Sequence, residues 1–336
     1  MRVGRLVGTL LGCVAVVCGF AFATEEPIRA AAICSVPFHA GAYDQAQWAA
    51  ISKVLIEEFG WHVTPVEGVP FPKLAEVGRD LALAGYDVII YTSSGHIAAW
   101  HEVAPEFPDT WFWLISQVED LPDSPRVVGL DIDAFNAGVI VGIAMAKLSQ
   151  AGHIGVVGGY PILALLHMFS GIFAGAQYVN PNISARVTWI GTWEDIPKAY
   201  EGAKTLIAEG ADVLFDISGW GYRGTISACE EAGIKFVGYA LDQSHESPVV
   251  VISHAWDLEH VYRKLATELM AGTLERQIYR CPPSYTYLIP APNRLPPELE
   301  AEIMELMKKV WAGEITLPRV ILTATELSEG IGPRYR

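Results

Sequence analysis

The chain has 336 residues, of which 51% are hydrophobic and 18% charged. One hydrophobic core rarely serves a chain of this length, so the length predicts two lobes of ordinary domain size. There are 23 Lys and Arg residues against 38 Asp and Glu, giving a formal net charge of −15. The sequence holds no basic run, which excludes nucleic acid as a partner. The acidic balance favours a monomer.

The first residues predict an export signal. Arg2 and Arg5 precede an apolar stretch over 6–22, and the small residues that end at Ala23 fit a cleavage site. A retained membrane anchor is the alternative, since the stretch is just long enough to span a bilayer. Lipidation at Cys13 is a third interpretation. Each predicts an exported protein, in the periplasm or otherwise outside the cytoplasm, with or without a lipid anchor.

From residue 30 onward, short buried strands alternate with amphipathic helices. The predicted strands are 30–36, 63–67, 87–91, 111–116, 153–158, 185–190, 212–216, 235–239 and 249–253. The predicted helices are 44–59, 71–83, 97–104, 135–150, 162–178, 196–209, 224–232, 258–271 and 296–312. The Pro- and Tyr-rich segment 282–297 is predicted to be an extended crossover into the last helix. This alternation predicts an α/β fold with parallel sheets covered by helices on both faces.

One internal repeat indicates how two such lobes are related. Residues 83–95 parallel residues 208–219, and each copy is a helix end, a Gly stop, a buried strand and a turn of small residues. Any two βα units share some likeness, which is the alternative interpretation. Two similar lobes would place Ser93, Ser94, His96 and the loop 218–220 around one cleft, because ligands bind outside the carboxyl ends of parallel strands.

Few motifs in the sequence could carry chemistry. Gly219 to Gly224 satisfies G-x-G-x-x-G, and Asp242 follows 18 residues later, as in a dinucleotide fingerprint. Trp220 and Tyr222 flank the second glycine and would obstruct a phosphate. We therefore interpret this segment as a cleft loop that carries an aromatic ring, and we predict no nicotinamide or other cofactor.

Metal-binding and catalytic patterns are also missing from the sequence. Asp131 and Asp133 form a D-x-D pair, but no acidic ligand set follows at metal spacing. No GxSxG, HExxH or P-loop motif occurs, and the cysteines form no CxxC pair. The sequence predicts no metal and no catalytic residue, which favours binding without chemistry.

Aromatic residues follow several predicted strands. They are Tyr43, Tyr160, Trp193, Trp220 and Trp256. Core packing is the alternative for each, but as a set they suit a flat ring, since one base–aromatic stack contributes about 1–3 kcal/mol. His96 and His254 lie near strand ends as well, although a lone His is more often a structural residue.

Several segments, in order along the chain, resemble one family. They are 156–159, 174–181, 191–195, 209–213, 238–243 and 269–273. Together they resemble the basic membrane protein family, the PnrA-like substrate-binding components of ABC transporters. The resemblance implies a periplasmic-binding-protein type I fold with two Rossmann-like lobes and three crossovers. It also implies a purine nucleobase or nucleoside as ligand, delivered to an ABC permease in the membrane.

The resemblance assigns roles to some residues and departs at others. Tyr43 matches a base-stacking position, Trp193 a second stacking position, and Asp242 an acidic residue near the hinge. Asp44 stands where nucleoside-binding members carry Asn. The segment 254–257 replaces a stretch with a ribose-binding Lys. A free nucleobase or another flat heterocycle therefore remains as open as a nucleoside.

The predicted first lobe comprises 24–129 and 244–280, and the second comprises 130–243 and 281–336. The predicted ligand-binding residues are Tyr43, Asp44, Ser94, His96, Tyr160, Trp193, Trp220, Asp242, His254 and Trp256. The predicted function is solute capture for an ABC importer. The alternatives are a nicotinamide-dependent or nucleoside-processing enzyme and a ligand sensor for a membrane partner.

Overall fold

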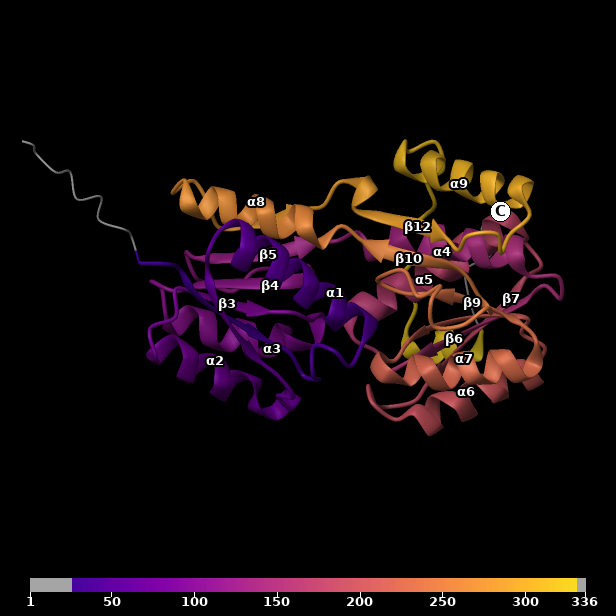
Figure 1. Cartoon of the computed structure of the whole chain (residues 1–336), viewed down its shortest axis with the longest axis horizontal. Coiled ribbons are helices and arrows are strands. Elements are labelled where there is room, and N and C mark those ends of the chain that lie inside the picture. The colour runs from indigo at the N-terminus through magenta and orange to yellow at the C-terminus, as the bar shows by residue number, and fades with distance from the viewer. Residues whose placement is uncertain (1–25, 331–336) are drawn as a thin grey trace, which may run out of the picture.

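The computed structural model describes residues 26–330. The predicted export signal and Cys13 lie outside these residues. The described chain forms two lobes side by side, each built on a six-stranded sheet with helices on both faces (Figure 1). The predicted α/β class is therefore confirmed.

The sheet of the first lobe is parallel throughout, with strand order β11-β5-β4-β3-β1-β2. Its strands are β1 (Arg29–Ile33), β2 (His62–Val66), β3 (Val88–Tyr91), β4 (Trp111–Gln117), β5 (Val127–Asp131) and β11 (Gln277–Arg280). Its helices are α1 (Ala42–Ala50), the π-helical continuation η1 (Ile51–Glu58), α2 (Leu74–Leu83), α3 (Ile97–Val103) and α8 (Leu258–Met270). Side chains of β4 alternate between the two faces: Phe112 packs with α2 and α3, and Trp113 packs with η1 on the other side.

The second sheet has the order β12-β10-β9-β8-β6-β7, and only β12 runs antiparallel to its neighbour. Its strands are β6 (His153–Gly158), β7 (Ser184–Trp189), β8 (Val213–Ile217), β9 (Lys235–Gly238), β10 (Val250–Trp256) and β12 (Thr286–Pro290). Its helices are α4 (Ala134–Leu148), α5 (Leu163–Val179), α6 (Ile196–Ala208), α7 (Tyr222–Ala232), α9 (Pro297–Trp311) and α10 (Ala324–Glu329). The last helix covers the edge strand β7, where Trp189 Nε1 donates to Ala324 O at 3.2 Å.

The chain passes between the two sheets three times, after β5, after β10 and after β11. The predicted first lobe included 244–280, but β10 pairs with β9 and β12 in the second sheet. The return to the first lobe therefore comes at Asp257 and not near residue 244. The strand is buried on both faces, so its apolar pattern carries no information about which sheet it joins.

Besides short 3₁₀ turns, four elements of residues 26–330 lie outside the predicted set: β5, β11, β12 and α10. Each is short, and β12 falls within the segment predicted to be extended. The internal repeat relates the two lobes, as predicted. Its two strands, β3 and β8, hold the same place in their sheets, and each leads into a short 3₁₀ turn, η3 (Ser94–His96) or η5 (Gly219–Gly221).

Helices α4 and α5 pack unusually closely. Both are apolar on nearly all sides, and both are buried. Glycines stand at the contact: Gly138 and Gly142 on α4, and Gly171 and Gly175 on α5. A Cβ at any of the four would lie 1.9–2.2 Å from a carbonyl oxygen of the facing helix. Within residues 26–330, no helix combines the length and apolarity needed to cross a membrane.

We predict that Gly142→Ala destabilises the protein strongly. The new methyl group would lie 2.1 Å from Ile172 O, so the helices must move apart, and overpacking of this kind costs about 1–3 kcal/mol or more. The matched control is Gly202→Ala in α6, where the methyl group would meet a Thr188 methyl at 3.1 Å. Urea denaturation measures both. Equal free energies of unfolding for the two variants would contradict the close contact.

Candidate ligand-binding site

A cavity lies between the two lobes. It has about 860 Å³ of unfilled space, part of it open to solvent, and residues of both lobes line it. Its walls are built where strands end: β1, β3 and β4 in the first lobe, and β7, β8, β9 and β10 in the second. Parallel sheets place the carboxyl ends of their strands at one edge, and here the two edges face one another.

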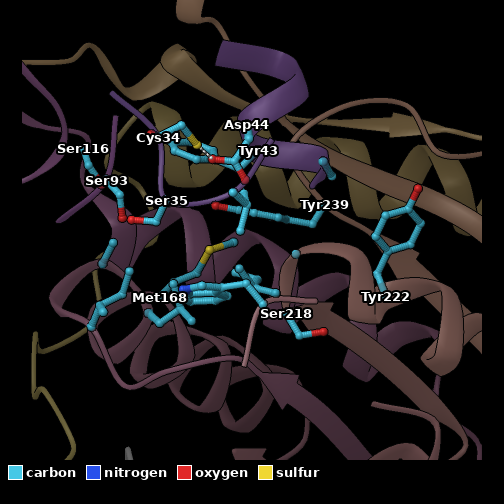
Figure 2. Close-up of a pocket in the computed structure, with 18 of the residues that line it drawn as sticks. Cys34, Ser35, Tyr43, Asp44, Ser93, Ser116, Met168, Ser218, Tyr222 and Tyr239 are labelled. Atoms are coloured by element: carbon cyan, nitrogen blue, oxygen red, sulfur yellow. Dashed lines mark hydrogen bonds between the residues drawn. The ribbon is translucent and has the colours of Figure 1, made fainter. Parts of the chain in front are cut away.

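The wall from the first lobe centres on the first turn of α1. Tyr43 and Asp44 lie there, and Cys34 and Ser35 follow β1 beside them (Figure 2). The Tyr43 hydroxyl donates to Ile115 O at 2.9 Å, which fixes its ring at the cavity wall. The ring is nearly parallel to that of Tyr239 across the cleft, with centroids 6.2 Å apart.

Asp44 is the carboxylate of this wall. Cys34 Sγ donates to Asp44 Oδ1 at 2.9 Å, and Oδ2 accepts no side-chain hydrogen bond within the described residues. Burial raises the pKa of Asp44 to about 6, although the Cys34 hydrogen bond opposes that rise. Burial also raises the pKa of the Cys34 thiol, with a contribution from the Asp44 charge, so the thiol stays protonated and remains a donor.

The second lobe contributes another carboxylate, Asp216 at the end of β8. Both of its oxygens already accept hydrogen bonds, from Ser218 Oγ at 2.6 Å and from Thr225 Oγ1 at 2.5 Å. Burial raises the pKa of Asp216 to about 7, against the effect of the two hydroxyl donors. Asp216 is therefore held by side chains of its own lobe through both oxygens, whereas only one oxygen of Asp44 accepts a side-chain hydrogen bond.

The cavity wall contains no Lys or Arg among the described residues. His96 lines it, but burial lowers the pKa of His96 to about 3, so its ring is neutral at physiological pH. The wall thus offers carboxylates and no cation to balance them. An anionic ligand would face repulsion here, and a ligand with N–H donors would find an acceptor in Asp44.

Trp193 lines the cavity from the loop after β7, and glycines make room for it. A Cβ at Gly159 would lie 2.2 Å from its ring, and a Cβ at Gly219 would lie 2.3 Å from its carbonyl oxygen. Trp220 N donates to that same oxygen at 2.8 Å. The G-x-G-x-x-G segment therefore holds the Trp193 loop in place. Its third glycine, Gly224, lets α7 approach the α6 backbone.

Half of the predicted site residues line the cavity. They are Tyr43, Asp44, His96, Trp193 and Trp256. Two others pack behind lining residues. Tyr160 meets the Trp193 ring edge at a centroid distance of 5.3 Å, and His254 stacks on Tyr239 at 5.7 Å.

Three predicted residues lie elsewhere. Ser94 Oγ accepts from Ala164 N at 3.2 Å, which links the two lobes. Trp220 also crosses between the lobes, with Nε1 donating to His39 O at 3.2 Å. Asp242 is exposed and borders a separate hollow beside α1, β10 and β12.

Sequence reasoning missed several lining residues. They are Cys34, Ser35, Ser116, Met168, Tyr239 and Gln243. Cys34, Ser35 and Tyr239 come within two residues of a strand end, so that rule alone would have found them. Met168 lies inside α5, where its apolar surroundings give no such signal. Within residues 26–330, no three His, Cys, Asp or Glu side chains gather in a way that could hold a metal ion.

Comparisons with known proteins agree with this architecture. The chain is 27% identical over 240 residues to a candidate ABC transporter glucose-binding protein of Haloferax volcanii, covering 71% of this chain and 59% of that protein. It is 27% identical over 241 residues to a purine-binding protein of Brucella abortus, covering 70% and 65%. The chain therefore spans less than two thirds of the length of each relative.

A solved structure shares the fold. The crystal structure of an ABC transporter solute-binding protein from Aeropyrum pernix superposes with a TM-score of 0.77, at 18% identity, over 91% of this chain and 98% of the other. The family model for PnrA-like ABC transporter substrate-binding proteins matches residues 36–279. That match takes in β2–β10 and most of the residues that line the cavity. The chain belongs to the PnrA-like family of ABC transporter substrate-binding proteins, a family that binds solutes and does not transform them.

Proposed function

We propose that this protein works outside the cytoplasm, where it captures an uncharged purine-like nucleobase or nucleoside between its lobes and delivers it to an ABC permease. The observation that carries the proposal is the cavity wall itself. It combines aromatic rings from both lobes with one carboxylate, Asp44, whose Oδ2 accepts no side-chain hydrogen bond among the described residues and whose cavity wall holds no Lys or Arg.

The two relatives named above are described as binding different solutes, a purine and glucose. The cavity favours the flat ring. Tyr43, Trp193, Tyr239 and Trp256 present aromatic surface to it, and flat heterocycles gain about 1–3 kcal/mol from each stacked ring. Asp44 suits the ring N–H or amino group of a nucleobase, because an ionised carboxylate only accepts hydrogen bonds.

Capture requires the lobes to close, and direct contacts between the lobes support this step. Ser94 meets Ala164, and Trp220 meets His39, both through hydrogen bonds that cross the cleft. Before a bound ligand can leave, these hydrogen bonds between the lobes must break and the chain must bend at its three crossovers. Hinged closure around a ligand is the usual motion of two-lobed binding proteins.

Calorimetry against adenine, guanine, their nucleosides, adenosine monophosphate and glucose tests the proposal directly. We expect micromolar or tighter binding of at least one base or nucleoside and none of the monophosphate. Mass spectrometry of the purified protein should detect the same class of compound. Binding of glucose with no heterocycle bound, or conversion of any ligand to a product, would refute the proposal.

Trp193→Ala should weaken binding of the heterocycle by about 1–3 kcal/mol, because one stacked ring is lost. Trp193→Phe keeps a ring and should recover most of the affinity. Trp189→Ala is the control, since Trp189 ends β7, four residues before Trp193, but packs against Phe169 and α10 outside the cavity. Calorimetry measures affinity, and urea denaturation checks the fold. Unchanged affinity in Trp193→Ala would remove Trp193 from the site.

Asp44 should make binding depend on pH. With its pKa at about 6, the carboxyl is protonated at pH 5 and loses its role as a pure acceptor. The affinity for a ligand that stays uncharged should therefore rise about tenfold from pH 5 to pH 7. Asp44→Asn cannot ionise and should show a flatter profile. Asp216 titrates in both proteins, so the difference between the two profiles isolates Asp44.

Stability of the unliganded protein provides an independent check on Asp44. The pKa of Asp44 is raised by folding from 3.8 to about 6, so the folded state binds more protons between these values. The free energy of unfolding should fall as pH rises through this window, more in the wild type than in Asp44→Asn. Parallel profiles for the two proteins, in both binding and stability, would show that Asp44 is not the titrating acceptor.

A further inference from the structure

Three serine hydroxyls gather at one end of the cavity. Ser35 follows β1, Ser93 follows β3, and Ser116 lies near the end of β4, so all three come from the first lobe. Figure 2 shows them on the same side of the cavity, away from Tyr239. We call these three residues the serine patch. The proposed function does not use them, because it relies on the aromatic rings and Asp44.

The protonation of His96 determines whether the Ser35 hydroxyl donates or accepts in the hydrogen bond between them. Its Nε2 lies 2.9 Å from Ser35 Oγ, and its Nδ1 is buried without a hydrogen-bond partner among the described residues. The ring is 1% exposed and neutral, so one nitrogen carries a proton and the other does not. A buried N–H without a partner is rarer in proteins than an unsatisfied acceptor. We therefore assign the proton to Nε2, which donates to Ser35 Oγ.

This assignment leaves the hydroxyl proton of Ser35 free. Ser35 Oγ accepts from His96, so its own O–H is available to the cavity. Ser93 Oγ likewise accepts, from Gly95 N at 3.1 Å, and keeps its proton. Ser116 is 3% exposed overall and borders the same space. The patch thus presents the O–H donors of Ser35 and Ser93, whereas Asp44 presents an acceptor.

We infer that the serine patch is a subsite that binds an acceptor oxygen of an uncharged group on the ligand. This inference rests on the proposed function and adds to it the second half of the ligand. Sugar hydroxyls and ring carbonyls both provide such oxygens. A phosphate or carboxylate does not fit, because no Lys or Arg lines the cavity among the described residues. The patch therefore selects oxygen-bearing bases or nucleosides over bases without oxygen.

The test measures by calorimetry the affinity of wild type, Ser35→Ala and Ser227→Ala for a set of matched ligands. Adenine has no oxygen, adenosine adds a ribose to adenine, and hypoxanthine replaces the 6-amino group of adenine with a ring carbonyl and carries a proton on N1. Ser227 is the control because its hydroxyl bonds to Arg223 O on α7 at an exposed position. Ser35→Ala should weaken an oxygen-bearing ligand about three- to tenfold, as expected for one lost hydrogen bond, and leave adenine unchanged.

The pattern of losses identifies the source of the oxygen. A loss for adenosine alone assigns the patch to the sugar, and a loss for hypoxanthine alone assigns it to the ring carbonyl. Equal affinities of wild type and Ser35→Ala for both ligands, or an equal loss for all three, would overturn the subsite while leaving the proposed function intact. If the wild type binds none of the heterocycles, the proposed function fails and the subsite fails with it. Urea denaturation confirms that each variant is folded.

Discussion

The close contact between α4 and α5 sets the position of the cavity floor. Four glycines let the two helix backbones meet, and a single methyl group at any of them would reach a facing carbonyl oxygen. Helix α4 begins immediately after the first crossover, and the start of α5 provides Leu165 and Met168 to the floor. The position of that floor determines how much space remains between it and Tyr43. Packing directly behind the cavity wall thus controls the depth of the site, because Gly138 faces the Met168 carbonyl and packed interiors transmit displacements.

Much of the fold follows from the sequence, because buried parallel strands are short apolar runs and the helices between them are amphipathic. The repeat also identified the equivalent strands β3 and β8. What the pattern could not provide was sheet membership. Strand β10 is buried on both faces, and its side chains would suit either lobe. Strand β11 is a half-exposed edge, and β12 contains Pro290, so neither has the apolar alternation that marks a strand.

The site was only partly predictable for a related reason. Position after a strand predicted Tyr43 and Trp193, and the family resemblance predicted Asp44; all three line the cavity, because topology brings strand ends together. It could not distinguish a lining residue from the one behind it. His254 and Tyr239 show this, since the buried imidazole supports the tyrosine ring from behind. The G-x-G-x-x-G segment is a further example. Its glycines allow Trp193 and α6 to approach closely, so a motif that is typical of phosphate binding marks tight packing here.

The three crossovers make each lobe a discontinuous piece of chain. Neither sheet can be assembled from one continuous stretch, because β11 must return to the first sheet after β10 has completed its place in the second. A nascent chain that has emerged as far as β10 has the partners for most of the second sheet, yet it still lacks an edge strand in both. Residues 277–290 therefore supply the missing edge strand of each sheet. A truncation before Gln277 would remove an edge strand from each lobe, and the two lobes could not be exchanged between relatives as single continuous segments.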